Sequence, residues 1–498
     1  SVPTPDVRRD APTRHDPSEQ PTVTSIRMRP FDVGLVVLLS AMSASPAVRA
    51  GPPPQLSVGV APRVAAVERS GITGGGVPVA SGDRVLLFYP NHPDDFGGSG
   101  GTASSLSDDA GRRWTALDDD RPLPDMVDVW ADPLPDGSWL AFGLGWVPDP
   151  QRRTELGPGD VPTDAYHAAF SRDAGRTWTV ERATIEYPPE IGVVARPLPH
   201  VVVLNDRRLV MPAYAWGKHG HSALLLESTD GGRRWTRAAT ICTTSDLVQA
   251  GIPPRTPWLE TTVARTTDGD LLAAVRTGSA ADSPLAAVRS GDGGRTWSAP
   301  EPWTAGASRS RVAGKLPTLT LLPDGVLLLL TAHSRNHCRL YVSADGRGRE
   351  WSEPYVVTSQ SGGNAGMCAA SRDSVFISTP MNGRIHVWRV TVGPSSETAA
   401  ELPPPTDVAF RDGVLTWNPA PGAAAYRVTP VLQRLPPAAD PATELLRYAT
   451  IETAGPKTEL DLSRQLLVGG EYEFEVRAID RDGRTSPGAK SRTAQVMR

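Results

Sequence analysis

The sequence reads Ser107-Asp108-Asp109-Ala110-Gly111-Arg112-Arg113-Trp114 at one point, and this eight-residue phrase decides the fold because it recurs. Four further copies keep its serine, aspartate, glycine and tryptophan, and they begin at Ser171, Ser228, Ser290 and Ser343. The starting serines lie 64, 57, 62 and 53 residues apart, and the fifth copy carries one extra residue before its tryptophan. A repeat of this length indicates one four-stranded unit per copy.

The chemistry of the phrase predicts a β-hairpin turn. An aspartate carboxylate accepts hydrogen bonds from backbone N–H groups of its own turn, and a glycine takes up the positive φ that other residues resist. Between the copies lie short apolar runs that follow turn residues and predict strands, namely Arg84–Tyr89, Trp139–Leu144, Arg208–Ala213, Asp270–Val275 and Val326–Thr331. Helical periodicity is nearly absent, so the pattern predicts an all-β chain.

These five phrases resemble the Asp-box, or BNR, repeat of the sialidase superfamily, and the resemblance covers about residues 55–395. It implies a six-bladed β-propeller over residues 51–398, a ring of sheets without long open edges. The sixth blade, Gly362–Val390, would be closed by a strand near Leu56–Val67. The family places its Asp boxes on the outer rim, so we expect their aspartates to be structural.

The chain after the predicted propeller indicates a second domain. Residues 399–405 contain Leu402-Pro403-Pro404-Pro405 and predict a stiff linker. Residues 406–498 resemble a fibronectin type III β-sandwich, because Tyr472, Phe474 and Val476 alternate along one strand. Trp417 would be the core tryptophan and Tyr472 the residue of the tyrosine corner. The expected fold class is therefore all-β, a six-bladed propeller followed by a β-sandwich.

Residues 1–50 predict a leader that is removed on export. Val33–Leu39 is a short apolar run behind the basic Arg29, and Val48-Arg49-Ala50 has small residues where a signal peptidase reads. The run is too short to span a bilayer, although a membrane anchor or a buried strand would be alternative interpretations. We therefore expect a secreted protein cleaved near Ala50, with no membrane span in the mature chain.

The amino-acid composition limits which partners and cofactors we expect the protein to bind. The 498 residues hold 51 Lys and Arg against 55 Asp and Glu, a net charge of −4, so no basic excess points to nucleic acid. No C-x-x-C motif or other spacing of metal ligands occurs, and we expect no cofactor. The three cysteines leave room for one disulfide, with Cys338–Cys368 as the candidate pair. The oligomeric state stays open.

The resemblance implies the site of an exo-sialidase. Such a site needs guanidinium groups for the substrate carboxylate, a proton donor, and a tyrosine nucleophile activated by a glutamate. Leu259-Glu260-Thr261, followed by Asp268-Gly269 and Arg276, matches the family stretch best. Glu260 would polarise the nucleophile and Arg276 would belong to the arginine triad. The alternative interpretation is an ion pair on the surface.

The other candidates fall in predicted loops. Arg335 would be a second triad arginine, with Arg339 as its competitor, and Asp94 or Asp95 would be the general acid. Arg196, Tyr214 and Trp216 would contact the substrate, because tyrosine and tryptophan suit stacking on sugar faces. Each of these residues could instead serve in packing or at the surface.

Two departures from the family weaken the expected mechanism. The stretch that should carry the first triad arginine reads Gly71-Ile72-Thr73-Gly74-Gly75-Gly76-Val77-Pro78, and Met367 stands where the tyrosine is expected. The prediction is a secreted exo-glycosidase that removes a terminal, acidic sugar from a glycan or polysaccharide. The alternatives are a propeller that binds carbohydrate or protein without catalysis, and a related hydrolase with another catalytic pair.

Overall fold

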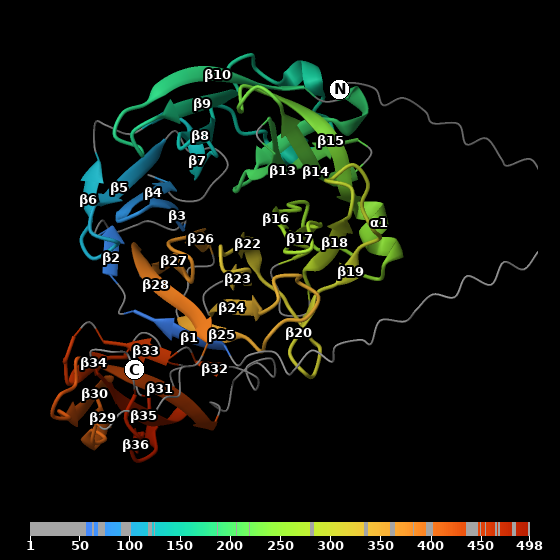
Figure 1. Cartoon of the computed structure of the whole chain (residues 1–498). Helices are drawn as coiled ribbons and strands as arrows, with labels where there is room; N and C mark the ends of the chain where they lie inside the picture. Colours follow the sequence, from blue (N-terminus) through green and yellow to red (C-terminus); the bar gives the residue numbers. More distant parts are fainter. Residues whose placement is uncertain are drawn as a thin grey trace, which may run out of the picture. The chain divides into compact units, whose positions relative to one another are not determined.

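A computed structural model describes residues 56–496 and is nearly all-β in that part of the chain, with the single short α-helix α1, Thr244–Gln249 (Figure 1). Short stretches are left out of the description, namely residues 62–63, 68–74, 91–100, 118–121, 124, 187, 206, 219, 279–282, 333–336, 359–363, 382, 395–401, 435–446, 449, 454, 464–465, 467–468 and 481–484. The predicted signal peptide lies outside the described residues.

The strands pair with their neighbours in chain order. The first sheet holds β3 (Val77–Ser81), β4 (Arg84–Pro90), β5 (Thr102–Ser107) and β6 (Thr115–Leu117). The next four strands are β7 (Val127–Pro133), β8 (Trp139–Leu144), β9 (Tyr166–Ser171) and β10 (Thr179–Glu186). All these pairs are antiparallel, which suits connections as short as the Asp-box turns.

The same pattern continues along the chain. The third group holds β11 (Val193–Pro197), β12 (Val202–Asn205), β13 (Arg208–Gly217), β14 (Gly220–Ser228) and β15 (Arg234–Thr243), and β15 also pairs with β10 in parallel. The fourth holds β16 (Thr261–Arg265), β17 (Leu271–Val275), β18 (Ala286–Ser290) and β19 (Glu301–Pro302). After the small hairpin of β20 (Thr304–Ala305) and β21 (Ser310–Arg311) come β22 (Lys315–Leu321), β23 (Leu327–Ala332), β24 (Cys338–Ser343) and β25 (Tyr355–Thr358). The five strands predicted from the sequence are confirmed.

The last of these sheets joins the two ends of the repeat region. β26 (Gly366–Ala369), β27 (Ser374–Met381) and β28 (Arg384–Pro394) are followed in the sheet by β1 (Leu56–Val60), while β2 (Val64–Val67) also pairs with β28. The first strands contact one another, since β3 touches β7 and β26, and β16 touches β13 and β22. The strands therefore surround a common centre in a propeller-like arrangement (Figure 1).

Each Asp box is a turn held by its own side chains. In the first box the Asp109 carboxylate accepts hydrogen bonds from the backbone N–H groups of Arg112 and Arg113 at 3.0 and 2.8 Å. The Ser107 hydroxyl accepts from the N–H of Gly111, and the Trp114 indole donates to the Gly111 carbonyl at 3.0 Å. Gly111 has φ +83°, which explains why glycine recurs there.

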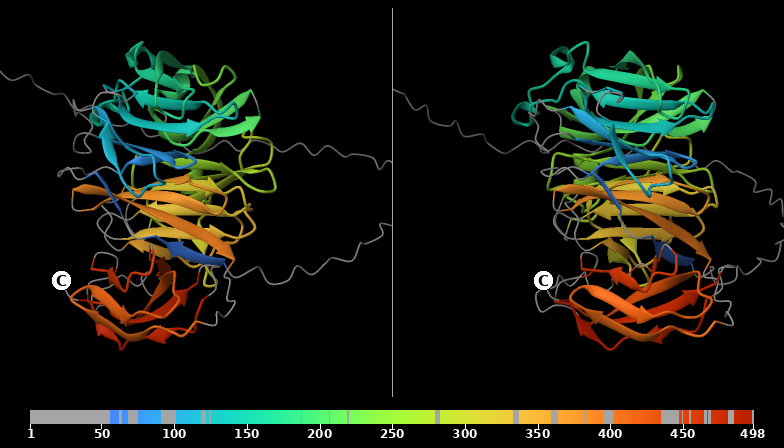
Figure 2. Two further views of the ribbon diagram at one scale, coloured as in Figure 1. Left: turned by 60° about the vertical axis from the view of Figure 1, so that its left-hand side comes forward. Right: turned by 90° about the vertical axis from the view of Figure 1, so that its left-hand side faces the viewer.

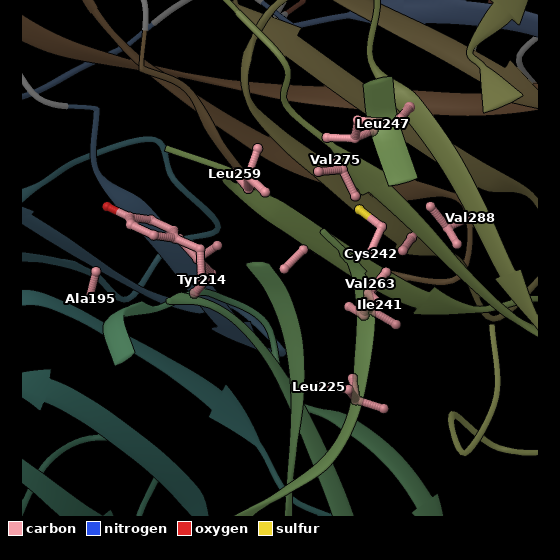
Figure 3. Packing of buried hydrophobic residues seen from close by; sticks show 14 of the residues in the cluster. Ala195, Tyr214, Leu225, Ile241, Cys242, Leu247, Leu259, Val263, Val275 and Val288 are labelled. Atoms are coloured by element: carbon pink, nitrogen blue, oxygen red, sulfur yellow. The ribbon is translucent and has the colours of Figure 1, made fainter. Parts of the chain in front are cut away.

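Apolar residues fill the space between neighbouring sheets. One such cluster joins the third and fourth groups and holds Val263, Val275 and Val288 with Leu225 and Cys242 (Figure 3). All of them are at most 2 % exposed. Strands buried on both faces read as continuous apolar runs, which is why the alternation expected for a half-exposed sheet is weak here.

The C-terminal strands build a core of their own. One sheet there consists of β29 (Thr406–Arg411), β30 (Val414–Asn418) and β34 (Glu459–Asp461). The other C-terminal strands are β31 (Ala425–Arg434), β32 (Arg447–Tyr448), β33 (Thr450–Glu452), β35 (Glu471–Ile479), β36 (Ala489–Lys490) and β37 (Ala494–Gln495) (Figure 2). Trp417 packs edge-on against Tyr426, and Tyr472 is fully buried with them. Trp417 is thus a core residue, as expected, and Tyr472 lies in the same core.

The predicted disulfide is wrong. Cys242, Cys338 and Cys368 are all free and buried. Cys338, the first residue of β24, belongs to an apolar cluster that includes residues of β27. Cys368 belongs to a different apolar cluster with Phe376 and Tyr89. Burial raises the pKa of each thiol, so the cysteines behave as small apolar residues. Of the helices described, none has the length and apolar character to cross a membrane.

The Asp boxes should make stability depend on acid pH. Hydrogen bonds from the Thr177 backbone N–H and hydroxyl hold the pKa of Asp173 far below its usual range. A carboxyl with a lowered folded-state pKa stabilises the fold above its unfolded pKa of about 3.9 and loses that contribution as pH falls. Asp173→Asn should therefore lower the melting temperature at pH 7 and reduce its fall between pH 5 and pH 2.5. Thermal unfolding at several pH values measures this, and the exposed Asp164→Asn is the control, in which an equal change would refute the explanation.

Candidate functional site

A cavity of about 420 Å³ lies where the first strands of the sheets meet. Its wall takes residues from each of the strand groups before residue 395, including Val77, Asp128, Arg196, Glu260, Leu316 and Gly366. No Asp-box residue lines this cavity. Clefts at the centre of such closed arrangements are the usual place for a small ligand.

Glu260 lines this cavity, and Arg276, which does not line it, pairs with Glu260. Glu260 directly precedes β16 and Arg276 directly follows β17, and these strands pair, so their adjoining ends bring the two side chains together. Arg276 Nη1 donates to Glu260 Oε2 at 2.5 Å, and the side chains are only 7 % and 9 % exposed. Leu316 N donates to the same oxygen at 3.2 Å. The pair is buried, so the alternative of a surface ion pair is wrong.

Arg196 forms a second ion pair at the cavity, and its partner was not predicted. Arg196 Nη2 lies 2.7 Å from Asp128 Oδ1. Both residues sit at irregularities, because the register of β7 shifts after Val127 and that of β11 shifts before Arg196. Asp128 has φ +51°, a left-handed conformation that non-glycine residues rarely adopt. A lone aspartate inside an apolar run was the signal that could have found it.

His200 forms a third charged contact, also missed from the sequence. Its Nδ1 lies 2.6 Å from Asp132 Oδ1, and its Nε2 lies 2.9 Å from the Met367 carbonyl oxygen. A carbonyl and a carboxylate are both acceptors, so the two ring nitrogens both donate when the imidazole is protonated. The contact joins β7, the segment after β11, and β26 around the cavity. His200 is therefore engaged at both nitrogens.

The pKa of His200 follows from these contacts. Burial, the largest influence, lowers the pKa, but the Asp132 carboxylate and the Met367 carbonyl outweigh it, so the pKa is raised above its ordinary value. Asp132 is itself anchored, because its Oδ2 accepts from Val201 N at 2.8 Å. The imidazolium is thus the form that fits this wall of the cavity.

The two departures from the family pattern occur at one contact between backbones. A Cβ atom on Gly366 would lie 2.3 Å from the Gly76 carbonyl oxygen, and one on Gly75 would lie 1.7 Å from the Asn364 carbonyl oxygen. The Ser378 hydroxyl donates to the Gly76 carbonyl at 2.5 Å and strengthens the contact. This close approach of β26 to the start of β3 leaves no space there for an arginine or a tyrosine side chain.

The side chain of Met367 does not face the cavity. Met367 is fully buried in the cluster between β24 and β27, and it is Gly366 that lines the cavity. Adjacent residues of a strand point to opposite faces, so the side chain of Met367 points away when Gly366 faces the cavity. Only the carbonyl group of Met367 serves the site, through His200.

Tyr214 and Trp216 lie behind the wall and do not present faces for stacking. Both are fully buried, and the Trp216 indole donates to the Pro257 carbonyl at 3.3 Å. The Tyr214 hydroxyl points away from the apolar cluster in Figure 3 and has no hydrogen-bond partner among the described residues. Burial raises the pKa of Tyr214, and the Arg196 charge, which lowers it, does not offset burial, so the phenol stays protonated.

The remaining predicted residues are not tested by the structure. Asp94, Asp95 and Arg335 lie outside the described residues. Arg339 is buried in β24, where its Nη2 lies 3.4 Å from His337 Nδ1, and it does not line the cavity.

The glycine contact should be sensitive to a single methyl group. Gly366→Ala places a Cβ against the Gly76 carbonyl, a backbone atom that cannot move aside alone, so we expect a loss of about 1–3 kcal/mol in the free energy of unfolding. Urea denaturation measures the loss. Gly393→Ala in β28 is the matched control, because its Cβ would meet no atom within 4 Å. Equal stability of the two variants would contradict the contact.

The His200 contact should stabilise the fold most at low pH. A group with a raised folded-state pKa contributes fully below its unfolded pKa, about 6.5, and loses that contribution as pH rises through the folded value. His200→Gln should therefore lower the free energy of unfolding by about 3 kcal/mol at pH 6 and by less at pH 9, as measured by urea denaturation. His167→Gln is the control. Burial and then Arg182 lower the pKa of His167, so its pH trend should be opposite. A loss for His200→Gln that grows with pH would refute the assignment.

Comparison with known proteins supports this description of the fold. Residues 156–402, just under half of the chain, match the family described as a BNR repeat-like domain. No curated protein shows significant similarity to the chain.

Several solved structures are similar to the chain. A protein of unknown function from Dyadobacter fermentans is 16 % identical over 68 % of this chain and 100 % of that one, with a TM-score of 0.51, a likeness of fold alone. The Hadza microbial sialidase Hz136 gives 19 % identity, 63 % and 64 % coverage and a TM-score of 0.46. An α-L-arabinanase of Penicillium chrysogenum is 13 % identical over 66 % of this chain and 98 % of that one, with a TM-score of 0.44. The chain is thus similar to BNR repeat-like domains over residues 156–402, in a propeller-like, nearly all-β fold.

Proposed function

We propose that the chain is a glycoside hydrolase that removes a terminal sugar from a glycan at the central cavity. The observation that carries the proposal is the placement of Glu260. One of its carboxylate oxygens is held by Arg276 and by Leu316 N, while Oε1 has no hydrogen-bond partner among the described residues. A buried carboxylate oriented in this way, on the wall of a cavity of about 420 Å³, suits a sugar-cleaving site.

A second carboxylate supports the same reaction. Asp128 lines the cavity with Glu260, and a pair of carboxyl groups is the usual machinery for cleaving a glycosidic bond. The proton donor of the proposal remains Asp94 or Asp95. Tyr89 and Pro90 line the cavity, and Asp94 follows Pro90 by four positions in the sequence. Glu260 would be the base or stabilising carboxylate.

The volume of the cavity favours attack at a chain end. About 420 Å³ is at the small end of the range for ligand pockets, which suits one terminal sugar better than an internal stretch of polysaccharide. The proposal includes a closed six-bladed propeller and export after removal of residues 1–50. It also includes a C-terminal fibronectin type III module over residues 406–498 that spaces or docks the enzyme.

A second candidate function is glycan binding without catalysis. It is favoured by Met367, because this residue stands where the family resemblance implied the tyrosine nucleophile and its side chain is fully buried away from the cavity. Tyr214 does not substitute for that nucleophile, since it is fully buried and does not line the cavity.

Glu260→Gln separates the two functions. The change keeps the shape and removes the charge, so turnover of 4-methylumbelliferyl glycosides should fall at least about 1,000-fold while binding persists. Glu186→Gln is the matched control, because Glu186 also pairs with an arginine, at 2.7 Å, but on the exposed surface. Unchanged turnover in Glu260→Gln would remove Glu260 from the mechanism. Glycan binding by a wild-type protein that cleaves none of the substrates would establish the second candidate.

A further inference from the structure

We infer that the sugar taken by the central cavity is uncharged, which rests on the proposed function and runs against the acidic sugar that the family resemblance implied. The inference comes from the charges around the cavity. Recognition of a sugar carboxylate requires guanidinium or other cationic groups that are available to it. At this cavity each cation of the described chain is already paired with a carboxylate of the protein.

Three such pairs surround the cavity. Arg196 lies 2.7 Å from Asp128, Arg276 lies 2.5 Å from Glu260, and His200 lies 2.6 Å from Asp132. The side chains of the last two pairs are at most 14 % exposed. Breaking a buried ion pair leaves an uncompensated charge in a poorly solvated place and is strongly unfavourable. An acidic sugar would meet cations whose charge a carboxylate of the protein already balances.

A further carboxylate makes the balance negative. Asp125 also lines the cavity, so the described groups at the cavity and their partners comprise three cations and four carboxylates. A substrate carboxylate would meet net repulsion, which water screens in part because Asp125 is exposed. Hydroxyl groups, by contrast, donate hydrogen bonds to carboxylate oxygens, and Glu260 Oε1 is placed to accept one.

The rest of the wall suits a neutral ring. Beside the positions where an arginine and a tyrosine were expected, the cavity is lined by Gly75, Ala365 and Gly366, which carry no charge. Trp146, which is only partly buried, supplies aromatic surface, which favours contact with the C–H faces of a sugar. Orientation would come from the carboxylates and the Asn364 amide, all on the cavity wall.

Paired substrates test the inference. The full-length protein is assayed on 4-methylumbelliferyl glucosides, galactosides and arabinosides, on the matching glucuronides and galacturonides, and on a sialoside. We expect a neutral glycoside to be cleaved with kcat/KM at least about 100-fold above that of its acidic counterpart, and with a KM that does not change between 20 and 300 mM NaCl. Preference for a uronide or sialoside, with a KM that rises with salt, would overturn the inference and leave the proposed hydrolase standing.

Binding keeps the two proposals distinguishable. If no substrate is cleaved, the proposed hydrolase fails, and isothermal titration with methyl glycosides and methyl uronides then decides the charge of the ligand. Tighter binding of the neutral glycoside supports the inference. Tighter binding of the acid, or no binding of any neutral sugar, overturns it.

A variant tests the ion pairing directly. Asp128→Asn removes the carboxylate that occupies Arg196. The affinity for the uronide relative to that for its neutral counterpart should therefore rise at least about tenfold. Asp136→Asn, in the exposed turn between β7 and β8, is the matched control and should leave the ratio unchanged. If a folded Asp128→Asn protein, checked by its melting temperature, keeps the wild-type ratio, ion pairing does not exclude acidic sugars and the inference is wrong.

Discussion

The Glu260–Arg276 ion pair lies at the wall of a cavity to which each strand group of the propeller-like region contributes. Its charges are 2.5 Å apart and almost fully buried. Burial of charges is unfavourable unless each has a partner, so the pair must form for the ends of β16 and β17 to lie where they do. The hydrogen bond from Leu316 N extends this constraint to the next sheet. The orientation of the carboxylate, and with it the proposed chemistry, depends on this arrangement.

The same principle governs the other charges at the centre. Arg196 with Asp128 and His200 with Asp132 each connect β7 with β11 or the segment after it, so the charged groups hold these first strands together and neutralise one another. On the remaining side, glycine backbones approach too closely for any side chain. A wall of mutually paired charges and bare backbone differs from one that offers several arginines to an anion. The expected arginine and tyrosine are therefore both missing from one region, where β26 contacts the start of β3.

Prediction from sequence succeeded where local chemistry decides structure. The Asp boxes and the strands between them follow from turn residues, apolar runs and repeat length, whereas the pairing of the N-terminal strands with β28 was implied by the family resemblance. That resemblance also pointed to Glu260 and Arg276, which the structure brings together because both lie beside strands that pair directly. Asp128 was missed because a register shift turns it toward the cavity, and the alternation of apolar residues does not reveal such a shift. His200 was missed because its position depends on contacts with Asp132 and Met367, which are distant in the sequence.

Turn chemistry and apolar repeats in the sequence were sufficient to establish the nearly all-β class, because these interactions join residues close together in the chain. The charge of the cavity was decided only by the tertiary structure. Asp128 and Arg196 are 68 residues apart, and His200 and Met367 are 167 apart, so their contacts exist only after the sheets have assembled. Whether an arginine is available to a ligand depends on the carboxylate that folding brings beside it.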